Sequence, residues 1–102
     1  MPVSKKRKIT RVREIRKVTF VVPEIFGEAE FVVPSLDMIQ GKYADMVADE
    51  TKSRMALRKF MADNGAEAEA EAFDELAGEA EHKMFLEAWQ DASGVTAPKS
   101  RG

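Results

Sequence analysis

The sequence predicts a small α+β fold, mainly α, in which an N-terminal β-hairpin is followed by three to four helices. Two short runs near the front, 16–22 and 29–33, alternate in the way that strands require. From residue 35 onward, apolar side chains recur at helical spacing, with stop signals at Asn64–Gly65 and Ser93–Gly94. These patterns favour one hairpin packed on several helices.

The chain of 102 residues holds one domain at most. We expect a flexible basic arm at 1–15, a single small domain at 16–95 and a flexible tail at 96–102. Within the domain, the hairpin is expected at 16–33 and the helices at 35–92. A core of this size is near the low end for independent stability, so self-association or a partner would help it.

The predicted hairpin has clear boundaries. Pro23 has no N–H to give to a ladder and ends the first strand, and the loop that follows contains Gly27. Pro34 closes the second strand. Because a lone hairpin is marginal in water, one of its faces must pack on the helices, and Phe20 and Phe31 are predicted for that face.

Two helices are predicted next. Ser35 is expected to be the N-cap of the first, with Asp37 in its first turn, where the helix dipole favours an anion. Five apolar side chains then share an arc of about 100°, namely Leu36, Ile39, Tyr43, Met46 and Val47. Residues 49–51 are predicted to cap the second helix, which Asn64–Gly65 ends.

The stretch 66–72, AEAEAEA, is interpreted as the exposed first turns of a third helix, with an acidic solvated spacer as the alternative. Phe73 and Leu76 then lie on a face rotated by roughly 130° from the face around Trp89. One straight helix cannot aim both faces at the same neighbour. The sequence therefore predicts two helical pieces that meet near Gly78.

The last predicted helix has an unusually wide apolar surface. Phe85 and Trp89 fall within one narrow arc, and Met84 and Leu86 flank it, so that the apolar surface spans roughly 200°. One interpretation places this helix deep in its own core. The other, which we adopt as a hypothesis, is that the belt exceeds what so small a fold can enclose and that part of it is kept for a partner.

Charge is distributed unevenly along the chain. Residues 1–22 carry eight bases and one acid, whereas residues 63–91 carry ten acids and one base. This layout favours head-to-tail self-association, or alternatively a fold-back or simple solvation of both segments. An electrostatic contact with phosphate or with an acidic neighbour is predicted for the bases of the arm, namely Lys5, Lys6, Arg7, Lys8, Arg11 and Arg13.

No catalytic constellation is apparent. The chain has no cysteine, and its one histidine, His82, stands among charged neighbours on a polar helix flank. It contains no Gly-rich phosphate loop, nucleophile elbow or HExxH motif. We expect no enzyme, no cofactor and no metal site. No apolar run approaches the length of about 18 residues that a membrane span needs, so no membrane contact is expected.

Two short segments resemble a known family. LEAWQDASGV at 86–95, with its Ala-Trp, spacer and Ser-Gly-Val, is similar to a segment near the C-terminus of tail assembly chaperones from long-tailed (siphovirus-type) bacteriophages of actinobacteria. The step from Val33 to Leu36, between a strand pair and the helices, also resembles that family. The likeness covers about residues 18–95, of which about ten are distinctive.

The resemblance implies a non-enzymatic assembly factor in the host cytoplasm that self-associates. Such a protein binds the tape measure protein, which is long and largely helical, and keeps it soluble while the tail tube polymerises around it. A wide apolar arc with methionines suits contacts with another helix. The predicted partner-binding residues are Met84, Phe85, Leu86 and Trp89.

Two alternatives remain open at this point. The chain could be a structural virion subunit of the tail or connector, whose basic arm reaches a neighbour. It could also be a small nucleic-acid-binding regulator that uses its basic arm. The acidic back half and the lack of a helix-turn-helix with a basic recognition helix oppose nucleic-acid binding.

Overall fold

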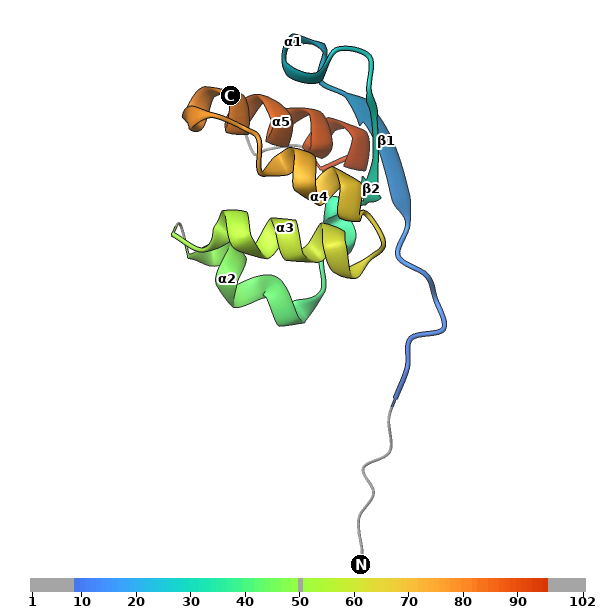
Figure 1. Cartoon of the computed structure of the whole chain (residues 1–102). Coiled ribbons are helices and arrows are strands. Elements are labelled where there is room, and N and C mark those ends of the chain that lie inside the picture. Colours follow the sequence, from blue (N-terminus) through green and yellow to red (C-terminus); the bar gives the residue numbers. More distant parts are fainter. Residues whose placement is uncertain (1–8, 50, 96–102) are drawn as a thin grey trace, which may run out of the picture.

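The computed structural model describes residues 9–49 and 51–95. It confirms the predicted α+β class, mainly α: a two-stranded antiparallel sheet is combined with five α-helices. The hairpin stands beside a stack of helices, and residues 9–16 run away from the body as an extended arm (Figure 1). The predicted arm residues 1–8 and the predicted tail 96–102 lie outside the described residues.

The hairpin forms as predicted. Strand β1 spans Lys17–Val21 and pairs antiparallel with β2, Glu30–Pro34. Phe20 stands opposite Phe31, and their rings stack with centroids 5.6 Å apart. Both face the helices, since Phe31 is buried and Phe20 half-buried. The connection is one helical turn, α1 (Pro23–Phe26), where we expected a plain loop.

The predicted first helix is wrong in its first half. After Ser35 the chain forms two 3₁₀ turns, Leu36–Met38 and Gly41–Tyr43, and only then the short helix α2, Ala44–Ala48. Ser35 stands at the N-cap position of the first 3₁₀ turn, but its hydroxyl is engaged with Arg16 and Asp37 and makes no cap hydrogen bond. These tertiary bonds replace the local cap that the sequence suggested.

Helix α3 spans Ser53–Asp63 and has no side-chain cap, contrary to the prediction for residues 49–51. The Asp49 carboxylate instead accepts hydrogen bonds from the N–H and hydroxyl of Thr51, which closes a turn before the helix. Glu50 lies outside the described residues. The predicted stop is confirmed, since α3 ends at Asp63 and the chain turns at Gly65.

The break near Gly78 is confirmed. Helix α4 spans Glu67–Phe73 and helix α5 spans Gly78–Ser93. Helix α5 ends as predicted at Gly94, which adopts the left-handed conformation with φ of 78°.

The acidic repeat is more than an exposed spacer. Ala66 is only 2% exposed and Ala70 only 1%. The two alanines lie one turn apart and face the core, whereas Glu67 and Glu71 face solvent. The small side chains let this segment approach its neighbours closely, so the repeat has a buried side and a solvated side.

One apolar cluster joins the hairpin to the helices. Its members come from both strands, from α3, α4 and α5, and from the 3₁₀ turn before α2. The largest enclosed side chains are Trp89, Tyr43, Phe60, Phe85 and Met61. This cluster fixes α5 across the inner face of the hairpin.

Candidate functional site

The centre of the α5 apolar belt is part of this core. Phe85 and Trp89 are both 0% exposed. The Phe85 ring lies 5.3 Å from Phe20 and 5.2 Å from Phe31, edge-on to each. Trp89 stacks on Phe60 with centroids 6.3 Å apart. The indole and its neighbour are therefore enclosed by the hairpin and by α3.

The indole nitrogen is satisfied as well. Trp89 Nε1 donates a hydrogen bond of 2.9 Å to the carbonyl oxygen of Pro34. A buried indole N–H is costly without such a partner. The prediction that Phe85 and Trp89 form a partner-binding surface is therefore wrong for the folded chain. Both side chains are enclosed by residues of the same chain, and the indole N–H has its hydrogen-bond acceptor there too.

The two flanking residues are less buried than Phe85 and Trp89. Met84 and Leu86 are half-buried and pack at the margin of the core. They lie on opposite flanks of α5, since two residues are separated by about 200° around a helix. Leu86 lines a surface hollow. The four predicted residues therefore do not form one surface: two are enclosed, and Met84 and Leu86 are half-buried on different flanks.

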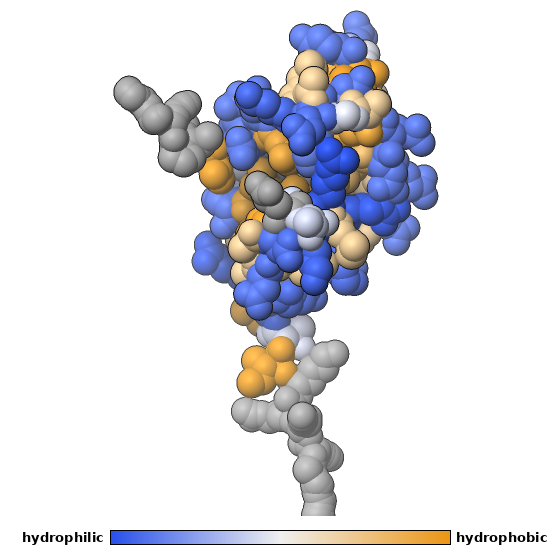
Figure 2. Space-filling view, turned by 90° about the vertical axis from the view of Figure 1, so that its left-hand side faces the viewer, coloured by the Kyte–Doolittle hydropathy of each residue, from blue (hydrophilic) through white to orange (hydrophobic). Residues whose placement is uncertain are grey.

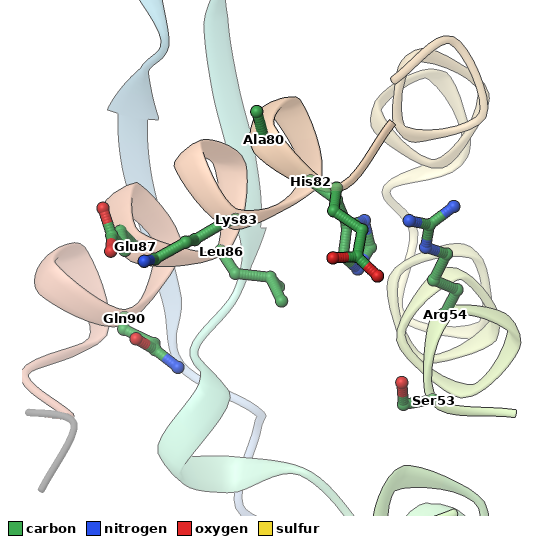
Figure 3. Close-up of a pocket in the computed structure, with 9 residues that line it drawn as sticks. Ser53, Arg54, Ala80, His82, Lys83, Leu86, Glu87 and Gln90 are labelled. Carbon is green, nitrogen blue, oxygen red and sulfur yellow. The ribbon is translucent and has the colours of Figure 1, made fainter. Parts of the chain in front are cut away.

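That hollow lies between the N-terminal end of α3 and the outer side of α5. It has a volume of about 780 Å³ and is lined by Ser53, Arg54, Glu79, Ala80, His82, Lys83, Leu86, Glu87 and Gln90. In Figure 3, Leu86 points from α5 into the space before α3, and Arg54 faces His82 across it.

A second hollow of about 300 Å³ shares Arg54 and His82 with the first and is lined as well by Met55, Arg58, Phe73, Asp74 and Leu76. We call the two together the α3–α5 groove. Met55 is 58% exposed and Leu76 half-buried, so apolar side chains accompany Leu86 along the groove. The space-filling view shows apolar surface set among hydrophilic side chains on the side of the molecule that it faces (Figure 2).

His82 stands at the junction of the two hollows. Its ring lies 5.1 Å from the Phe73 ring. Partial burial lowers the pKa of His82 below its usual value, the Arg54 charge lowers it further, and Glu79 opposes them. The imidazole therefore favours its neutral form, and an apolar partner in the groove would meet a neutral ring. Local sequence patterns do not indicate this placement, because Arg54 lies 28 positions before His82 in the chain.

The walls of the groove carry charges of both signs. Arg54 and Lys83 supply positive charge, whereas Glu79 and Glu87 supply negative charge. Arg58 is tied to Asp74 by an ion pair of 2.7 Å, which joins α3 to the turn after α4. The groove therefore presents a few apolar side chains, Leu86, Met55 and Leu76, among charges of both signs.

The structure describes only two of the six basic residues for which we predicted a contact with an anion. Lys5, Lys6, Arg7 and Lys8 lie outside the described residues. Arg11 and Arg13 are exposed on the extended arm, and neither forms an ion pair within residues 9–49 and 51–95. Arg11 Nε donates to the Arg13 carbonyl oxygen at 2.9 Å, a local contact. The two guanidinium groups are therefore open to an anionic neighbour.

The arm is fastened where it joins the body. Arg16 forms an ion pair of 2.9 Å with Asp37 and donates to the Ser35 hydroxyl at 2.9 Å. The same guanidinium reaches the Ser93 carbonyl oxygen at 3.4 Å, at the end of α5. The Ser35 hydroxyl donates to the Asp37 carboxylate, and this bond, followed by the Arg16 guanidinium, holds the pKa of Asp37 below its usual value. The bonds of Arg16 also orient the arm relative to β1.

In the described part of the chain, no group of three or more His, Cys, Asp or Glu side chains could hold a metal ion. Within the same ranges, no helix combines the length and the apolar character that crossing a bilayer requires. Comparison with known proteins found no matching family model, no similar curated protein and no similar solved structure.

Proposed function

We propose that this protein is a phage tail assembly chaperone of the host cytoplasm, which holds a helical segment of the tape measure protein in the α3–α5 groove. The resemblance at residues 86–95 and at the Val33–Leu36 step supports the family. The single observation that carries the binding mode is the groove itself, with Leu86, Leu76 and Met55 accessible along it.

The groove suits a helix better than an extended peptide. An amphipathic helix buries side chains at positions i, i+3, i+4 and i+7 in an apolar groove between two helices. Leu86 and Met55 belong to α5 and α3, the two helices that form its sides. Methionine and leucine adapt to varied apolar surfaces, which suits a partner with a long and repetitive helical sequence.

The charged rim adds selectivity. Arg54 and Lys83 would pair with acidic positions of the partner helix, and Glu79 and Glu87 with basic ones. Rim charges mainly affect the rate and the register of association, whereas the enclosed apolar anchors carry most of the affinity. A chaperone that must later release its client benefits from this division, because the apolar floor is small.

The test is co-expression of the chain with helical segments of a tape measure protein, followed by measurement of the soluble fraction and of the complex that is recovered. Leu86→Gln, which places a polar group on the floor of the groove, is expected to reduce recovery of the complex by about tenfold or more. Met55→Lys, at an exposed position, should act in the same direction with less risk to folding.

Met84→Gln is the matched control, since Met84 is also half-buried on α5 but lies on its other flank. It should leave recovery near that of the natural chain. Equal loss in Leu86→Gln and Met84→Gln, or unchanged recovery in Leu86→Gln and Met55→Lys, would show that the groove does not hold the client.

A further inference from the structure

The two edges of the hairpin differ. On β2, Pro34 has no N–H, and the outward N–H of Val32 donates to Glu69 Oε2 at 3.3 Å. The Pro34 carbonyl oxygen accepts the indole N–H of Trp89. Helices α3 and α4 pack beside this strand. The β2 edge is therefore partly closed by the chain's own groups, at Val32 and at Pro34.

The edge of β1 is open. The N–H of Ser35 donates to the Arg16 carbonyl oxygen at 2.7 Å, which marks a bonded position of the ladder. In an antiparallel pair such positions alternate, so the backbone groups of Lys17, Thr19 and Val21 point away from β2. Among the described residues these outward groups form no hydrogen bond, and all three residues are exposed.

We infer that the open edge of β1 pairs antiparallel with β1 of a second copy of this chain, which joins two hairpins into one four-stranded sheet. Unpaired strand edges readily accept another strand, and a two-stranded sheet is marginal by itself. The register that uses all the outward groups sets Thr19 opposite its own counterpart, with Lys17 opposite Val21 of the second copy. This register places no like charges face to face.

Charge explains why the occupant is a second copy. In this register the arm of one copy, which leads into β1, runs past the far end of the other copy's β1, toward its α1 turn. The arm carries Arg11 and Arg13, which are free of ion pairs within the described ranges. Residues 23–30 around α1 carry Glu24, Glu28 and Glu30 and no base. The basic arm of each copy therefore lies beside the acidic segment 23–30 of the other copy.

Apolar contacts add to the pairing. Val21 and Val32 are 41% and 43% exposed on the outer face of the hairpin, and Val12 on the arm is 97% exposed. In the joined sheet, Val21 gains the hydrocarbon stem of Lys17 of the second copy as its neighbour across the new strand pair. Thr19 meets its counterpart in a cross-strand pair of β-branched residues, which is favourable. This surface is separate from the α3–α5 groove, so the inference does not depend on the proposed function.

Sedimentation equilibrium on the full chain tests the inference. Thr19→Glu and Thr19→Lys each place like charges opposite one another at the two-fold axis, and each is expected to weaken the dimer by about tenfold or more. An equimolar mixture of the two variants should restore it as a heterodimer. Val32→Glu and Val32→Lys, on the same outer face but on the other strand, should leave the dimer nearly unchanged.

A single cysteine provides a second readout, because the chain has none of its own. Thr19→Cys should form an intermolecular disulfide under mild oxidation, since opposed residues in such a pair have Cα atoms about 5.5 Å apart. Val32→Cys should not. A natural chain that is monomeric at about 1 mM, charge variants that dimerise normally, or a mixture that stays monomeric would each overturn the inference. Trp89 fluorescence verifies that every variant is folded.

Discussion

The two sides of α5 differ in how completely the chain encloses them. On the inner side, Phe85 and Trp89 are fully buried, and the one indole N–H has a partner. On the flank that faces the hollow, Leu86 remains half-buried, and Lys83 and Glu87 beside it are exposed. One helix thus supplies the centre of the core and one wall of a surface groove. The difference shows that a wide apolar arc on one helix can be fully buried at its centre and only half-buried at its flanks.

The largest expected effect is on the inner side. Trp89→Ala should lower the free energy of unfolding by about 3–5 kcal/mol, because it leaves a cavity and an unpaired Pro34 carbonyl oxygen. Urea denaturation monitored by circular dichroism measures this. Trp89→Phe keeps most of the packing and should cost much less. A loss below about 1 kcal/mol in Trp89→Ala would contradict the enclosed position of the indole.

The same contrast between an enclosed and an outer side can be tested on α4. Ala70→Leu should cost about 1–3 kcal/mol of unfolding free energy through overpacking, because Ala70 is only 1% exposed. Ala68→Leu, at an exposed position of the same acidic repeat, should change stability by less than about 0.5 kcal/mol. Equal effects would mean that the repeat is solvated on both sides.

A smaller effect is expected where the core meets solvent, at Tyr43. Its ring is buried, and its hydroxyl donates to Asp63 Oδ2 at 2.6 Å. Burial and then this bond raise the pKa of Tyr43 to about 12. Since it is the only tyrosine, ultraviolet titration should give one phenolate midpoint near 12 instead of 10. A midpoint near 10 would place the hydroxyl in solvent.

Tyr43→Phe should cost about 1 kcal/mol at neutral pH, since Asp63 is partly exposed. The bond to Tyr43 lowers the pKa of Asp63 below 3.8. This stabilisation is therefore present above about pH 3.8 and is lost as the pH falls through the lowered value. The difference between the variant and the natural chain should shrink in acid, as urea denaturation at several pH values would show.

The smallest expected effect is beside the hollow between α3 and α5, at His82. Burial and the Arg54 charge lower its pKa below 6.5. NMR titration of the ring proton should therefore give a midpoint below 6.5, and Arg54→Gln should raise it. Lys83→Gln is the control, because its charge does not contribute to this shift. Because the lowered pKa favours the neutral form, the associated stability is present at neutral pH and is lost as acid protonates the ring.

Local signals in the sequence predicted the strands, the stops after α3 and α5, and the break before Gly78. Each of these depends on residues that are adjacent in the chain: alternation in a strand, glycine in a left-handed turn, or two apolar faces rotated relative to one another. The resemblance at 86–95 is likewise a property of the sequence, and the function that it implies is our proposal.

Only the tertiary structure decided which apolar surface is enclosed. The sequence shows a belt of roughly 200° around α5 but not the rings of Phe20, Phe31 and Phe60, which three other elements bring against it. Ser35 likewise looks like a cap until Arg16, 19 positions earlier, engages its hydroxyl. Burial depends on partners far away along the chain. The residue pattern within one segment therefore predicts its secondary structure, whereas the segments packed against it determine which of its side chains stay exposed.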